Sequence, residues 1–218
     1  MKKLNIYYLL VITSLLTFSC DLTEDPDVGG TNTKDMAGEW YLQLIDPADS
    51  VTVYVDYSLA TTSNTAANVA DKMLFDDAAH FFHFQCKMNT NQQNLTFNAE
   101  NAENIQYDPA HTPPAAKPKP IPAIGSVKTQ LSATPKLMTI TNGTITKNSF
   151  SPPSKTKTDF LSCLMTGIYR GYNYVAESYA ITGTDTSVVW KLRDESDVPD
   201  GPYIISGYKR TGFLEDEH

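Results

Sequence analysis

Alternation of apolar and polar residues with a period of two is the feature that most constrains how this 218-residue chain can fold. Between Val51 and Leu59 the odd positions are Val, Val, Val, Tyr and Leu, and the even positions are Thr, Tyr, Asp and Ser. Successive side chains of a strand point to opposite faces of a sheet, so the pattern predicts a half-buried strand. A second such strand is predicted over 80–88, with its phenylalanines on one face.

Turn signals separate further segments of the same kind. Asn142-Gly143 lies between two alternating segments and predicts a tight hairpin. The segment Asp197–Pro202 predicts a second turn, a solvated acidic hairpin tip. No stretch predicts a long amphipathic helix, and 66–77 is expected to hold a helical turn or two at most. Other strands are expected at 39–45, 93–98, 126–132, 137–141, 144–150, 157–165, 174–182, 187–193 and 203–211.

These elements predict an all-β fold, an antiparallel sandwich or up-and-down barrel of about eight to ten strands. One segment interrupts the pattern. Residues 108–125 contain six prolines, too many for the interior of a strand. We expect an extended, polyproline-like excursion there, which is either a lid over a cavity mouth or a long surface loop between barrel strands.

The N-terminus has the layout of a secretory signal. Lys2 and Lys3 precede an apolar run over 4–18, and the small residue Ser19 stands directly before Cys20. The cysteine resembles the lipidated residue of a bacterial lipobox, although Thr17 occupies the position where a leucine is usual. We therefore expect a signal peptide over 1–19 and lipidation of Cys20. An ordinary signal peptide with a cysteine near the cut is the alternative.

The expected mature protein begins with an acidic tether over 20–35, followed by a single domain over 36–218. Without Lys2 and Lys3, 15 basic residues oppose 25 acidic ones, a net charge of −10. Such a chain would repel the phosphates of nucleic acids, so nucleic acid is excluded as an expected partner. We expect contact with the membrane through the acyl chains on Cys20.

Cys86 and Cys163 remain once Cys20 is lipidated. In an oxidising compartment the pair could form a disulfide. The alternative is that both are small buried hydrophobic residues. The sequence leaves this choice open, because it does not show how far apart their Cα atoms lie.

Two positions near the ends of the domain resemble the lipocalin and calycin signature. Gly38-Glu39-Trp40 opens the first predicted strand, and Arg210 lies on the last. In that group the tryptophan closes one end of the barrel and packs against an arginine of the final strand. A guanidinium stacked on an indole gains cation–π attraction. The resemblance therefore implies that Gly38, Trp40 and Arg210 close the barrel.

Longer stretches resemble one family, the Bacteroidetes lipoproteins called lipid-binding putative hydrolases, which are lipocalin-like. They are Met36–Tyr41, 64–77, Phe81–Lys87, and Ile205–Phe213 with Glu215–Glu217. The resemblance implies a barrel, an outer-membrane anchor facing the cell surface or the periplasm, and a small apolar ligand. The Pro-rich excursion departs from the family pattern, and the family supplies no catalytic motif to carry over.

An apolar ligand would need an apolar cavity, and the inward faces of the predicted strands supply candidates for its lining. The alternative is a filled barrel, because small barrels pack their interiors with such side chains. The cavity candidates are Leu42, Leu44, Phe82, Phe84, Val188, Trp190 and Leu192.

Catalysis has little support in the sequence. There is no Gly-x-Ser-x-Gly motif, and Ser154-x-x-Lys157 follows two prolines, not a helical start. His80 and His83 are three apart in a predicted strand and would face opposite sides, so no metal site, cofactor or catalytic residue is expected. The expected function is non-enzymatic binding of an apolar ligand. The alternatives are a filled-barrel accessory subunit of an outer-membrane complex and, third, a hydrolase of unknown substrate; the oligomeric state is left open.

Overall fold

The computed structural model describes residues 30–218, and Asn32–His218 form one compact unit. The predicted signal peptide, Cys20 and the tether up to residue 29 lie outside the described residues. Within them the chain forms nine strands and one short 3₁₀ helix, and no helix is long and apolar enough to cross a membrane. The elements are β1 (Gly38–Ile45), β2 (Val53–Asn64), β3 (Lys72–Asp76), β4 (Gln85–Asn91), β5 (Thr96–Glu103), β6 (Val127–Leu131), β7 (Leu137–Phe150), β8 (Thr158–Thr182), β9 (Asp185–Lys209) and η1 (Leu214–Asp216).

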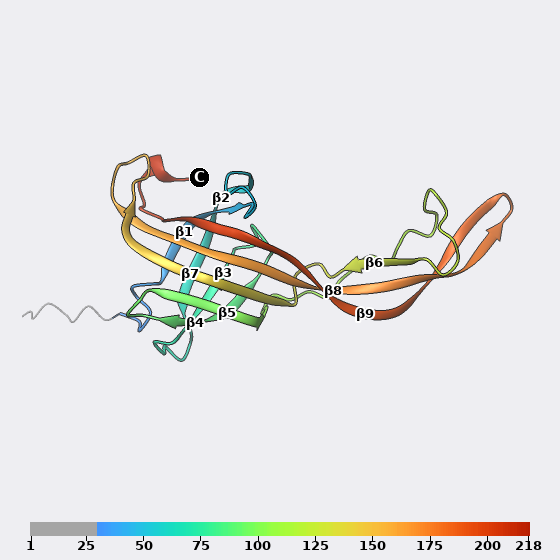
Figure 1. Cartoon of the computed structure of the whole chain (residues 1–218), viewed down its shortest axis with the longest axis horizontal. Coiled ribbons are helices and arrows are strands. Elements are labelled where there is room, and N and C mark those ends of the chain that lie inside the picture. The colour runs from blue at the N-terminus through green and yellow to red at the C-terminus, as the bar shows by residue number, and fades with distance from the viewer. Residues whose placement is uncertain (1–29) are drawn as a thin grey trace, which may run out of the picture. The chain divides into compact units, whose positions relative to one another are not determined.

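Eight of these strands close into an antiparallel barrel (Figure 1). Neighbours in the ring follow the chain from β1 to β5 and then β7, β8 and β9, and β9 pairs with β1 to complete it. The predicted all-β, up-and-down barrel is confirmed. Ring closure gives each of these strands hydrogen-bonded neighbours on both sides, which removes the exposed edges of an open sheet.

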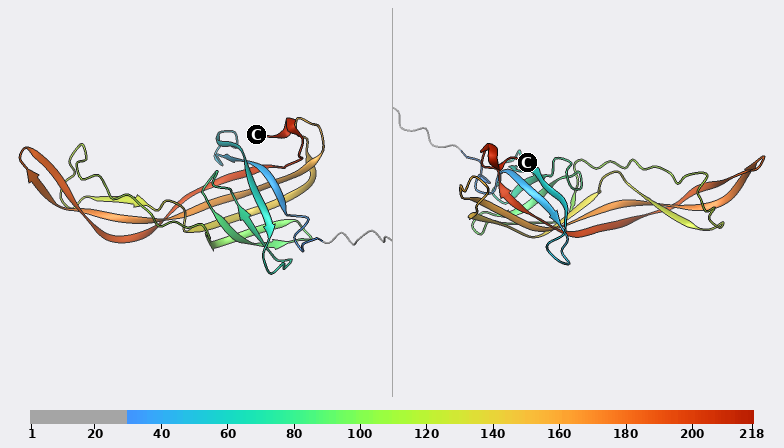
Figure 2. Two further views of the ribbon diagram at one scale, coloured as in Figure 1. Left: turned by 180° about the vertical axis from the view of Figure 1, so that it is seen from behind. Right: turned by 90° about the horizontal axis from the view of Figure 1, so that it is seen from above.

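The two longest strands continue past the barrel. β8 and β9 are 25 residues each, and they stay paired from Gly167–Asp200 to Thr182–Asp185, where the chain turns. At about 3.3 Å per residue, the 15 residues 168–182 extend roughly 50 Å. Figures 1 and 2 show this ribbon projecting from the barrel, with β6 paired alongside β8. We call residues 106–132 and 168–200 the arm.

The predicted hairpin at Asn142-Gly143 is wrong, because both residues lie within β7. Asn142 has φ +55°, and the register between β7 and β8 shifts between Thr141 and Thr144, so the dipeptide forms a bulge. A Cβ atom on Gly143 would come within 2.4 Å of the Phe97 side chain, so glycine is required for β5 to pass this close.

The predicted turn over Asp197–Pro202 is also wrong. These residues are part of β9, and the expected strands 187–193 and 203–211 are one element. Ladder pairing decides this: Asp197 lies opposite Arg170 on β8, and the guanidinium of Arg170 lies 3.4 Å from the carboxylates of both Glu195 and Asp197. The acidic residues that were predicted to form a solvated hairpin tip therefore lie in a sheet, where a cation on the neighbouring strand stabilises them.

The predicted strand over 80–88 begins only at Gln85, because Asp77 folds 77–84 into a loop. The Asp77 carboxylate is fully buried and accepts backbone N–H groups from five residues of the loop. Buried donors need such partners, so one side chain fixes the loop's path. The donors are Ala79 (3.0 Å), Phe81 (3.2 Å), Phe82 (2.7 Å), His83 (2.8 Å) and Phe84 (2.9 Å).

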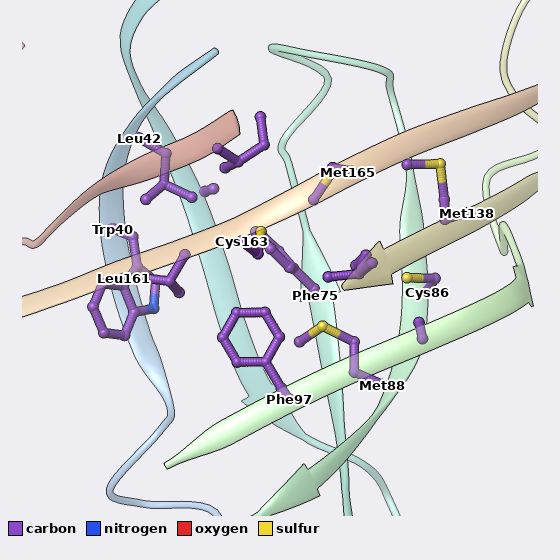
Figure 3. Close-up of a cluster of buried hydrophobic side chains, with 14 of the residues drawn as sticks. Trp40, Leu42, Phe75, Cys86, Met88, Phe97, Met138, Leu161, Cys163 and Met165 are labelled. Carbon is purple, nitrogen blue, oxygen red and sulfur yellow. The ribbon is translucent and has the colours of Figure 1, made fainter. Parts of the chain in front are cut away.

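Side chains fill the interior of the barrel (Figure 3). Trp40, Leu42 and Phe75 are fully buried, and Phe97 reaches toward them from β5. Methionine is prominent in this core, and an unbranched thioether adapts its shape more readily than a branched side chain. All five methionines of the described residues have no exposed surface: Met36, Met73, Met88, Met138 and Met165.

Candidate ligand-binding site

The predicted cavity residues fall into two groups that lie in different parts of the molecule. Leu42, Leu44, Phe82 and Phe84 belong to the barrel core, where each is less than 9% exposed. They pack against other side chains in the filled interior (Figure 3), with Leu42 on β1 facing the same core as Met165 on β8.

Val188, Trp190 and Leu192 lie on the arm instead, in the distal half of β9. Val188 is buried and its N–H donates to the Ala116 carbonyl at 2.7 Å. The Trp190 indole N–H donates to the Ala115 carbonyl at 3.0 Å. Leu192 is 44% exposed. Val188, Trp190 and Leu192 recur at every second position, as core residues of a barrel strand do, so this pattern does not reveal that they lie outside the barrel.

The Pro-rich segment leads from β5 to β6, and the chain then continues to β7. Its backbone covers one face of the β8–β9 ribbon. The His111 ring stacks on the Tyr172 ring with centroids 3.6 Å apart, and its Nε2 lies 2.9 Å from the Tyr174 hydroxyl. Gly125 N–H donates to the Ala176 carbonyl at 2.8 Å. The segment is therefore the covering layer of the arm and does not lie over a barrel mouth.

At the barrel end formed by the start of β1, the cation above Trp40 is Lys209, with Nζ 5.8 Å from the indole centroid. The predicted stack of Arg210 on Trp40 does not form. Neighbouring residues of an extended chain point to opposite sides, so Arg210 faces away from the indole. Gly38 lies beneath Lys209, since a Cβ there would come within 2.5 Å of the lysine Cε.

Arg210 instead joins the two ends of the domain. Its guanidinium nitrogens lie 2.8 Å from the carboxylates of Glu39 and Glu217, and we call these three residues the C-terminal clasp. Hydrogen bonds from Arg210, and then from Tyr41, lower the pKa of Glu217. At this end of the barrel, Arg210 thus links β1 to the C-terminal segment.

Cys86 and Cys163 are free thiols buried in the barrel core. Burial raises the pKa of the Cys86 thiol to about 12, with a further contribution from the charge of Asp77. Burial also raises the pKa of Cys163 well above its ordinary value. Since the thiolate is the reactive form, both residues act here as small hydrophobic side chains.

The histidines that the structure places take part in packing and turns. His80 Nδ1 lies 2.9 Å from the Leu59 carbonyl, and His218 Nε2 lies 2.6 Å from the Tyr208 hydroxyl. Across residues 30–218, no serine, threonine or cysteine side chain hydrogen-bonds to a histidine, and no three metal-ligating side chains gather.

A partly open apolar groove lies on the outside of the barrel wall, over β3 and β4. It comprises two connected recesses of about 480 Å³ and about 300 Å³, which share Lys87 and Ile105. Residues of β3 and β4 alternate between core and groove, so Met73 and Phe75 point inward while Leu74 points outward. We call this the outer-wall groove, lined by Thr65, Ala66, Ala67, Val69, Lys72, Leu74, Lys87, Ala102, Glu103 and Ile105.

Inference from the sequence missed this groove. The run Met73-Leu74-Phe75 is continuously apolar, so it does not show the alternation that reveals which side chain faces outward. Ile105 follows β5, and its N–H donates to the carbonyl of Gln85, which places Ile105 beside the start of β4. The available signal was the spacing of Lys72, Leu74 and Asp76, which marks the outer face of a strand.

Comparison with known proteins gives one positive result. The model of a family described as lipid-binding putative hydrolase matches residues 25–214. Among curated proteins, none matches this chain.

Proposed function

Because this chain belongs to the family of lipid-binding putative hydrolases, we propose that it binds a small lipid-like ligand without catalysis, and that the outer-wall groove holds the ligand's apolar part. The observation that carries the location is the contrast between a filled barrel interior and an open apolar recess on its wall. A ligand in the groove covers Val69 and Ile105, which are 39% and 58% exposed. Removing this surface from water favours binding.

Lipid binding at this place is testable with the compact unit 32–218, which contains the complete barrel and its core. Displacement of a fluorescent fatty-acid probe measures affinity. The double variant Leu74→Ser, Ile105→Ser should bind at least about tenfold more weakly, since each lost apolar contact costs about 1 kcal/mol or more. Val53→Ser, on β2 and 43% exposed, is the matched control and should bind like the parent protein. Equal affinity of parent and double variant would move the site elsewhere.

We further propose that the protein is an exported lipoprotein, attached through acyl chains on Cys20 to the outer membrane and facing the cell surface or the periplasm. The basic start, apolar run and small residue before Cys20 support this. Two or more acyl chains suffice for stable anchoring. In cells that make the full chain, Cys20→Ala should remain unacylated and leave the membrane fraction. Normal membrane retention of that variant would refute the anchor.

One observation favours a second candidate function, an interaction subunit beside an outer-membrane complex. The arm exposes eight large apolar side chains, and large exposed apolar patches mark sites of protein–protein or membrane interaction. A photo-crosslinker at Ile181 should then yield a defined adduct with an outer-membrane protein, while one at Val53 on the barrel should not. Absence of any adduct from the arm would remove this candidate. The exposed residues are Ile121, Ile124, Val127, Leu131, Tyr179, Ile181, Val189 and Leu192, each at least 40% exposed.

A further inference from the structure

The outer-wall groove carries two lysines beside its apolar wall, and they indicate which lipids it selects. We propose that the groove binds single-chain anionic amphiphiles, with the acyl chain along Leu74 and the anionic head between the ammonium groups of Lys72 and Lys87. This inference rests on the proposed function, because it names the ligand class of the same groove.

The sheet register brings the two lysines together. Leu74 on β3 lies directly opposite Lys87 on β4, and Lys72 lies opposite Asn89, two residues further along β4. Lys72 and Lys87 are therefore diagonal neighbours on the outward face, a spacing of about 7–8 Å that long side chains readily span. Both ammonium groups can reach one carboxylate or phosphate placed between them.

Charges at this end of the groove are not already neutralised. None of the ion pairs within residues 30–218 involves Lys72 or Lys87. The Lys72 ammonium donates to the side-chain carbonyl of Asn89, a neutral partner. Two unpaired cations beside each other on an acidic protein form a local site for an anion.

Two acidic residues lie on this side of the barrel: Asp76 on the outward face of β3, and Glu103 in the lining of the groove. Asp76, at the other end of β3, accepts hydrogen bonds from the Gln85 amide at 2.9 Å and from the Ala78 N–H at 2.8 Å. Glu103 lines the smaller recess together with Lys87, Ala102 and Ile105, whereas Lys72 lines the larger recess. Both lysines therefore line the larger recess and Glu103 lines the smaller one, which orients an anionic head toward the larger recess.

The apolar wall alone would accept neutral and charged lipids alike. Lysine stems can lie along such a wall while their charged ends stay in water. A charge-assisted hydrogen bond adds affinity only for a head that carries the opposite charge. Selection for anions therefore depends on Lys72 and Lys87, and uptake of the chain depends on Leu74 and Ile105.

The test compares binding of dodecanoate, dodecyl phosphate and the neutral dodecanol to the unit 32–218, all below micelle formation, by calorimetry at low and high salt. We expect the anions to bind about tenfold more tightly than dodecanol at low salt, with the preference reduced by salt. Lys72→Met combined with Lys87→Met should abolish the preference and leave dodecanol binding unchanged. Lys128→Met, an exposed lysine on strand β6, is the matched control and should keep it.

Each outcome decides one of the two proposals. Tighter binding of dodecanoate identifies a carboxylate head, and tighter binding of dodecyl phosphate identifies a phosphate head. Equal binding of all three amphiphiles overturns selection for anions while lipid binding stands. An anion preference that survives in the double lysine variant also overturns it. Failure of every amphiphile to bind overturns the proposed function itself.

Discussion

The barrel and the arm share strands β8 and β9, and the two regions differ in which segments pack against these strands. Within the barrel, Leu161, Cys163 and Met165 on β8 are at most 2% exposed, because the ring surrounds them on all sides. Further along β8, Ile181 is 73% exposed. The ladder between β8 and β9 extends across both regions, with shifts of register at three places. Strand pairing and core formation are therefore separable properties of this chain.

Within residues 30–218 no ring of strands encloses the arm, and the Pro-rich segment covers it instead. A two-stranded ribbon is marginally stable by itself in water. Here the Pro-rich segment covers the ribbon through the His111–Tyr172 stack and through backbone bonds to Ala176 and Val188. Where the chain leaves the barrel, the buried Asn104 amide donates to the carbonyls of His83 (3.2 Å) and Pro135 (2.8 Å), which holds the end of β5 and the start of β7 against the 77–84 loop. Four predictions test this comparison.

The largest effect is expected in the barrel, at Asp77. Asp77→Ala leaves five backbone donors of the 77–84 loop without their acceptor, and each buried unsatisfied donor costs about 1–3 kcal/mol. The free energy of unfolding in urea should fall by at least about 4 kcal/mol, or the barrel should fail to fold. Glu100→Ala, at an exposed position of β5, should stay within about 0.5 kcal/mol of the parent. A similar small change for Asp77→Ala would contradict the role assigned to this carboxylate.

The same substitution should have unequal effects in the two regions. Leu161→Ala in the fully buried barrel core should reduce the free energy of unfolding by about 3 kcal/mol, because it removes contacts and leaves a cavity. Leu192→Ala on the arm should cost less than about 1 kcal/mol, since its side chain is 44% exposed. Denaturant titrations of both variants measure the difference. Equal losses would show that the arm is as tightly packed as the barrel.

Loosening the covering layer should affect the arm alone. His111→Ala removes an aromatic stack worth about 1 kcal/mol. Amide hydrogen exchange at Gly125 and Val188 should therefore accelerate by about fivefold, while the Leu42 amide in the barrel keeps its rate. Lys119→Ala, in the same segment, is the control variant and should leave all three rates unchanged. Acceleration at Leu42 as well would mean that arm and barrel open as one unit.

The smallest effect should come from the C-terminal clasp and should depend on pH. The pKa of Glu217 is lowered in the folded protein, so its contribution is complete above the ordinary glutamate pKa of about 4.3 and is lost as pH falls through the lower folded-state pKa. The melting temperature of Glu217→Gln should lie slightly below that of the parent at pH 7, and the difference should shrink progressively as pH falls below the ordinary glutamate pKa. A difference that stays constant with pH would exclude the carboxylate charge as its source.

Much of the fold was predictable because alternation is a local property. Strands β1 and β6 lie within a residue or two of their predicted limits, and β2 overlaps the predicted strand 51–59 but begins two residues later and ends five residues later. Errors arose where a local signal competes with tertiary contacts. Asn142-Gly143 would turn a free hairpin, but pairing with β5 and β8 holds it as a bulge. Likewise, Asp77 gathers N–H groups that a strand would have used in its ladder.

The candidate site was less predictable than the fold. The outer-wall groove depends on Leu74 facing out of a continuously apolar run and on Ile105 returning to the edge of β4, and neither is visible in a single segment. The cation predicted to lie over Trp40 was Arg210, whereas the structure places its neighbour Lys209 there. Adjacent Lys209 and Arg210 are both cationic, and only the geometry at the end of β9 decides which one meets the indole.

The sequence by itself determined the all-β class and the place of most of the strands along the chain. Tertiary structure alone decided where the barrel ends along β8 and β9, that Val188 and Trp190 meet the Pro-rich segment, and that Lys72 and Lys87 share a groove. The physical reason is that alternation marks the two faces of a strand and carries no information about what lies opposite either face. The segments that pack against a strand face are distant in the chain. They determine whether that face is buried in the core, covered by another segment or left open as a binding surface.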